Sequence, residues 1–193
     1  MKNRRIVLVV IVLILILLGI ALAIKALSSE SVVEQNQETM VLAPEPPSND
    51  ELMPGLPADA TDEQKSAEVY RQIEAAQRVI EQQGVIKPLS GPINDRPEFV
   101  SMFEWELMQF AVENQGLSAS SAEFTDLVNL LRFNKLLEYW ENLSANNQPA
   151  TAATRQALAA QLLAEFPSWV EAGKLSPQDF EQLEPRLQAD LSR

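Results

Sequence analysis

The chain has 193 residues with fifteen Lys or Arg and twenty-seven Asp or Glu, and its formal net charge is −12. It contains neither His nor Cys, which excludes His- or Cys-based nucleophile systems, zinc sites of the usual ligand types and disulfides. Its acidity disfavours binding to nucleic acid.

The N-terminal sequence is typical of a membrane anchor. Ile6 to Ile24 is a run of nineteen residues without a charged or polar side chain, and Lys2, Arg4 and Arg5 precede it. As an α-helix it would be about 28 Å long, close to the ~30 Å of a bilayer's hydrocarbon core. We predict that residues 1–25 form a basic cytoplasmic tip and a single transmembrane helix.

Charge around the span predicts its orientation. Residues 1–30 carry four basic and one acidic side chain, whereas the other 163 carry eleven basic and twenty-six acidic ones. The positive flank should stay in the cytoplasm, so the rest of the chain should lie outside an inner (plasma) membrane, in a periplasm-like compartment. The alternative is a secretory signal peptide that is cleaved at Ala21-Leu22-Ala23. Signal peptides usually have apolar regions of only ~7–15 residues, so the longer run here favours an uncleaved signal-anchor.

Residues 26–60 have the composition of an acidic, Pro-rich linker. Five prolines interrupt any regular element: Pro44, Pro46, Pro47, Pro54 and Pro57. We expect a disordered tether that holds the rest of the chain away from the bilayer. Alternatively, the apolar pairs Val41-Leu42 and Leu52-Met53 are short anchor points for a partner within this tether.

Residues 61–193 have helical periodicity throughout, which predicts an all-α domain, a compact bundle of about five helices. The first should begin at Thr61, capped with Gln64, and end at Gly84. The second should begin at a capping box of Ser101 and Glu104. Eight of the eleven residues from 102 to 112 are apolar, so we expect this helix to be the most enclosed.

Three further helices complete the predicted bundle. Ser120 should cap the longest one, which supplies much of the core. The next begins near Thr151 and should be interrupted at Pro167, and the last begins at Ser176 and should bend or split at Pro185.

No metal or cofactor site is predicted. The segment Gly173–Phe180 resembles the second half of an EF-hand loop, with Asp179 at the twelfth position. Its first half would offer Ser168, Val170 and Ala172 at the ligand positions, which leaves calcium almost no carboxylate. A glycine stop followed by a Ser-Pro helix start explains the same residues.

Carboxylates are the only candidates for acid–base chemistry. Glu104 and Glu106 lie in the most apolar predicted helix, but two residues apart they diverge by about 200° and cannot face one bond. We expect Glu104 to close the capping box and Glu106 to reach solvent or a basic partner such as Arg132. Beside them, 107–110 resembles the Gly-Leu-Met-Gln-Ile segment of lytic transglycosylases, with Glu106 in place of the glycine.

The layout of anchor, Pro-rich tether and helical acidic body resembles that of membrane-anchored periplasmic accessory proteins, including lipase-specific foldases. None of the foldase motifs is present. We expect a non-catalytic module that binds another protein, one in the membrane or the periplasm. A chaperone or foldase for secreted clients, which needs an exposed apolar groove, is the first alternative, and a carboxylate-based cell-wall hydrolase is the second.

The candidate partner-binding residues are Arg96, Glu98 and Phe99. They lie in the segment that joins a connection rich in Pro and Gly to the second helix. A large ring beside two opposite charges is typical of interface hot spots. The alternative is that Phe99 packs under the loop while Arg96 and Glu98 are solvated.

Overall fold

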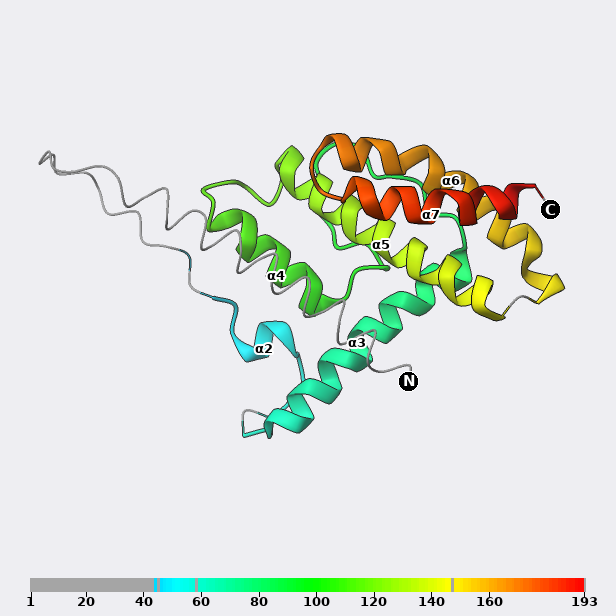
Figure 1. The fold of residues 1–193 in the computed structure, drawn as a ribbon. Helices are drawn as coiled ribbons and strands as arrows, with labels where there is room; N and C mark the ends of the chain where they lie inside the picture. The colour runs from blue at the N-terminus through cyan, green and yellow to red at the C-terminus, as the bar shows by residue number, and fades with distance from the viewer. Residues whose placement is uncertain (1–43, 45, 58, 147, 193) are drawn as a thin grey trace, which may run out of the picture. The chain divides into compact units, whose positions relative to one another are not determined.

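The computed structural model describes residues 44, 46–57, 59–146 and 148–192, and every regular element in these ranges is helical (Figure 1). The elements are α2 (Asn49–Leu52), α3 (Asp62–Gln83), α4 (Met102–Glu113), α5 (Ala122–Asn146), the short 3-10 helix η1 (Pro149–Thr151), α6 (Ala152–Glu171) and α7 (Pro177–Leu191). The all-α prediction is therefore confirmed for the described residues.

The predicted membrane span, Ile6 to Ile24, lies outside the described residues, as do residues 26–43 of the predicted linker. Of the helices that are described, none is both long and apolar enough to cross a bilayer. The span and its orientation therefore stay predictions from the sequence.

The helix α5 is the centre of the fold. It has ten buried residues, whereas α4 has three, so the prediction that the second helix of the bundle is the most enclosed is wrong. The helix α6 packs against both α5 and α7, and α3 and α4 also contact α5 (Figure 1). Edge-to-face ring pairs join the layers: Trp105 of α4 lies 4.9 Å from Phe124, and Phe133 lies 5.4 Å from Phe166 of α6, centroid to centroid.

Local signals set most helix ends. The capping boxes at Thr61 and Ser101 are both present, and α3 ends at Gly84, whose φ is +72°. The start of α5 differs from the prediction by one residue. The hydroxyl of Ser121 accepts from the Phe124 N–H at 3.2 Å, while Ser120 donates its own N–H to Ser118 in the preceding turn.

Two prolines lie inside continuous helices, so the predicted interruption at Pro167 and the predicted split at Pro185 are wrong. Proline removes one backbone hydrogen bond and strains the preceding turn. Both rings are exposed, and the neighbouring side chains hold the backbone helical: Phe166 is 1% exposed and Leu187 is fully buried. Tertiary packing therefore outweighs the local cost of each proline.

The helix α2 and the turn after it lie within the range 26–60 that the sequence assigns to a linker. Ser48 precedes α2 and donates both its N–H and its hydroxyl to the Glu51 carboxylate, at 2.6 and 2.7 Å. Met53 is only 4% exposed. These contacts make α2 a structured extension of the bundle on the side of α4.

Candidate functional site

The helix α4 has large apolar side chains on two opposite faces. At about 100° per residue, Trp105, Met108 and Val112 share one direction, and all three are buried in the core. The other direction is shared by Phe103, Leu107 and Phe110, whose side chains are half-buried. We call these three residues the outer apolar face.

The sequence contains a signal for this face. The high apolar content of residues 102–112 predicts enclosure, as is usual for a helix that is apolar all round. Separating the two faces by the helical period would have indicated a second apolar surface. Only the fold shows that the core covers one of them.

The side-chain amide of Gln72 in α3 connects the start of α4 to α2. The Gln72 side chain of α3 accepts a hydrogen bond from the Phe103 N–H at 3.1 Å, and its Nε2 donates to the Leu52 carbonyl of α2, also at 3.1 Å. The Phe103 N–H is one of the first-turn groups that have no partner within their own helix. Gln72 therefore fixes α2, α3 and α4 together beside the outer apolar face.

Carboxylates lie along one edge of this face. Glu106 and Glu113 project from the same side of α4, about 60–80° around the helix from Phe103. Partial burial raises the pKa of Glu106, and the negative charges of Glu51 on α2 and of Glu113 raise this pKa further. We call Glu51, Glu106 and Glu113 the acidic edge.

Glu104 has a different role from Glu106. It closes the Ser101 capping box and accepts a hydrogen bond from the Lys135 ammonium at 2.8 Å. Burial lowers the pKa of Lys135, and the Glu104 charge opposes this shift. The two carboxylates therefore take part in separate interactions, in line with their predicted divergence.

The three residues proposed from sequence for partner binding occupy different environments. Phe99 is 4% exposed and belongs to the core. Arg96 is exposed and donates to the Val100 carbonyl, and exposed Glu98 accepts from Gln83 at 3.4 Å. Of the three, only Arg96 and Glu98 therefore present side chains to solvent, and their role in binding stays a prediction.

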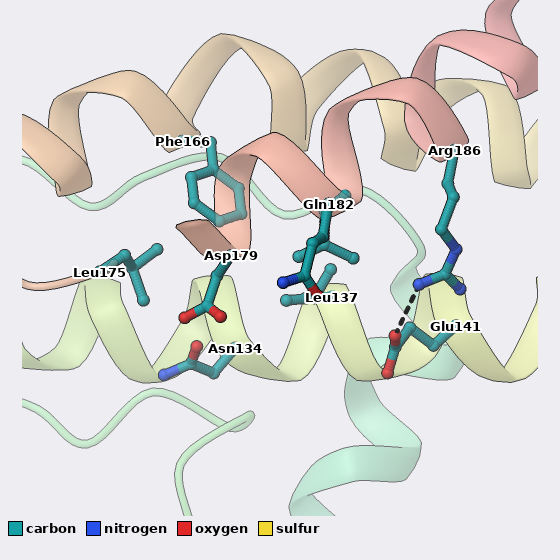
Figure 2. Close-up of a pocket in the computed structure, with 9 residues that line it drawn as sticks. Asn134, Leu137, Glu141, Phe166, Leu175, Asp179, Gln182 and Arg186 are labelled. Atoms are coloured by element: carbon teal, nitrogen blue, oxygen red, sulfur yellow. Dashed lines mark hydrogen bonds and ion pairs between the residues drawn. The ribbon is translucent and has the colours of Figure 1, made fainter. Parts of the chain in front are cut away.

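A groove of about 350 Å³ lies between α5 and α7 (Figure 2). Apolar side chains, including the buried ring of Phe166, line part of it. Asn134 and Asp179 lie near one end of it and Gln182 near its middle, and Arg186 approaches Glu141 at 3.4 Å at the other end. Each of these polar residues is exposed or half-buried, so the groove has no desolvated polar group that would orient a ligand.

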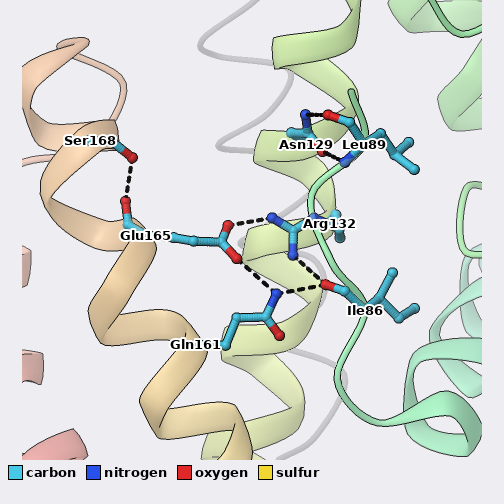
Figure 3. A network of polar contacts seen from close by, with 7 residues as sticks. All are labelled: Ile86, Leu89, Asn129, Arg132, Gln161, Glu165 and Ser168. Carbon is cyan, nitrogen blue, oxygen red and sulfur yellow. Dashed lines mark hydrogen bonds and ion pairs between the residues drawn. The ribbon is translucent and has the colours of Figure 1, made fainter. Parts of the chain in front are cut away.

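A buried polar network connects the 85–97 segment to α5 and α6 (Figure 3). The fully buried Arg132 forms an ion pair with Glu165 and donates to the Ile86 carbonyl, which also accepts from Gln161 at 2.6 Å. The proposed pairing of Glu106 with Arg132 is thus wrong, because Arg132 lies inside the bundle and α6 supplies its carboxylate. The network stabilises the connection rather than forming an open site.

Among the described residues, no group of three or more acidic side chains is arranged to hold a metal ion. Comparison with protein-family models, with curated protein sequences and with solved structures gave no match to this chain. The outer apolar face and its acidic edge are therefore the arrangement on which we base a function.

Proposed function

We propose that this chain is a single-pass membrane-anchored module that binds another protein on the extracytoplasmic side of the membrane and has no catalytic role. The anchor rests on the Ile6–Ile24 run and its basic flank. The binding role rests on one observation, the half-buried outer apolar face of α4.

The outer apolar face suits a protein interface for energetic reasons. Burying a Leu or Phe side chain fully stabilises by about 1.5–3 kcal/mol, and a side chain that is still at most about a third exposed retains at most about a third of that for a partner. Three such side chains in one row would contribute at most about 1.5–3 kcal/mol before the entropic cost of association. Aromatic residues beside a polar rim are also typical of interface hot spots.

Photo-crosslinking in the intact membrane tests this proposal. A photoreactive phenylalanine analogue placed at Phe110 or at Leu107 should give a discrete protein adduct. The same analogue at Glu181, an exposed residue of α7, is the control and should not give that adduct. Equal labelling from all three positions would contradict a partner on the outer apolar face.

A reporter fusion tests the location. A reporter that is active only beyond the membrane, fused after Arg193, should be active, and mass spectrometry should find the Met1 end still attached. A reporter signal confined to the cytoplasm would reverse the orientation, and a mature chain beginning near Ile24 would replace the anchor with a cleaved signal.

A chaperone for secreted clients is the second candidate, and the same outer apolar face favours it, because a holdase needs accessible apolar surface. A holdase should suppress aggregation of several unrelated unfolded proteins at stoichiometric concentration. A dedicated interaction module should leave their aggregation unchanged.

A further inference from the structure

The acidic edge restricts which partner can cover the outer apolar face. Glu106 and Glu113 are seven residues apart on α4, which places them about two helical turns, or roughly 10 Å, apart along one side. Glu51 of α2 adds a third negative charge near Glu106. Any occupant must therefore place its own groups beside three carboxylates, one of which is half-buried.

Charge disfavours binding of this protein's own residues 26–43, or of a second copy of the chain, to the outer apolar face. Residues 26–43 carry Glu30, Glu34 and Glu38 and no basic residue, so docking them here would bring like charges together. A second copy of the chain would bring the same acidic edge and the same net negative charge. An anionic lipid surface would be repelled for the same reason.

The outer apolar face has the spacing of a helix-binding row. Phe103, Leu107 and Phe110 are at i, i+4 and i+7, the spacing with which helices pack side by side. A partner helix lying along α4 would bury its own apolar row against these three side chains. Its flank would then run beside Glu106 and Glu113.

We infer that the outer apolar face and acidic edge bind an amphipathic helix of a partner protein, one that has Lys or Arg about seven residues apart beside its apolar row. This inference rests on the proposed function and adds the chemistry of the partner. Basic groups so placed would neutralise the acidic edge while the apolar rows come into contact.

Three synthetic amphipathic helices test the inference. They share one Leu row and differ at two flanking positions seven residues apart, which are both Lys, both Gln or both Glu. Binding of each fluorescently labelled helix to the full chain in nanodiscs of zwitterionic lipid is measured, with empty nanodiscs as the blank. The Lys helix should bind at least about fivefold more tightly than the Gln helix, and the Glu helix should bind most weakly.

Charge-matched variants locate the effect. The double variant Glu106→Gln with Glu113→Gln should lose the preference for the Lys helix. The double variant Glu171→Gln with Glu181→Gln changes the net charge equally at exposed residues outside this edge, and it should keep the preference. Thermal unfolding of each variant checks that the fold is retained.

The outcomes separate this inference from the proposed function. If the Lys and Gln helices bind equally and Leu107→Asp abolishes both, the basic partner is overturned while an apolar interface stands. If the Lys preference persists in the Glu106→Gln, Glu113→Gln variant, the acidic edge is overturned as its source. If none of the helices binds, the helical partner is overturned, and the photo-crosslinking result still decides the proposed function on its own.

Discussion

Lys135 is a buried cation whose charge is balanced by Glu104 at 2.8 Å. Removing one partner of such a pair leaves an uncompensated charge and typically costs about 3–5 kcal/mol. Gln at position 104 can still act as the capping-box acceptor, so Glu104→Gln isolates the loss of charge. We expect this variant to lower the free energy of unfolding in urea by about that amount.

The double variant is the control for this prediction. Glu104→Gln combined with Lys135→Met removes both charges, and most of the lost stability should return. A single variant that loses less than about 1 kcal/mol would show that water or another group already compensates Lys135.

Glu106 should make stability depend on pH. Its pKa in the fold lies above the ordinary value of 4.5, so the folded state holds the proton more tightly than the unfolded chain. The ionised carboxylate therefore destabilises the fold at neutral pH, and this cost disappears as the pH falls through the raised pKa. Glu106→Gln should raise the melting temperature at pH 7, and the gain should shrink toward pH 4. A gain that does not change with pH would contradict an electrostatic cause.

Residue identity alone did not reveal which charges are buried. Arg132, Lys135, Arg155 and Asp190 are each at most 5% exposed. In the sequence they resemble the charged residues on the solvent side of any amphipathic helix. Their partners come from other helices, as in the 3.3 Å contact between Arg155 and Asp190, so only the tertiary fold identifies them.

At the scale of elements, a helix start can be predicted from the sequence where a side chain within three residues caps it. The starts at Thr61, Ser101 and Ser176 follow this rule. The start of α2 follows it too, because Ser48 and Glu51 have capping-box spacing. The prolines on both sides of α2 indicate a linker and conceal this signal.

The course of the helices through Pro167 and Pro185 was not predictable by local rules, because distant packing decides it.

The exposed proline at position 167 leads to a prediction about stability. Pro167→Ala restores the missing N–H at an exposed helical position, so the free energy of unfolding should rise by about 1–3 kcal/mol. A shift of the urea midpoint at unchanged slope measures it. A lower midpoint would mean that proline stabilises mainly by restricting the unfolded chain.

At the scale of the whole molecule, the bundle should fold without the predicted anchor, and α2 should contribute to its stability. A fragment of residues 44–193 should unfold cooperatively and with the same midpoint in the presence of a chelator. A fragment of residues 61–193 lacks the buried Met53 and the bond from Gln72 to Leu52. It should be less stable by about 1.5–3 kcal/mol. Equal stability of the two fragments would show that α2 is dispensable for the fold.

The position of α2 also limits the reach of the docking surface. The helix contacts α4 and is the first described element after residues 26–43. These eighteen residues separate the described part of the chain from the predicted membrane segment, and fully extended they cover at most about 65 Å. If the predicted span is inserted, the first described residues would stay within about that distance of the bilayer, which favours partners in or near the same membrane. Confinement to this layer would raise the frequency with which α4 meets a partner in the membrane, so that even a weak contact would form repeatedly.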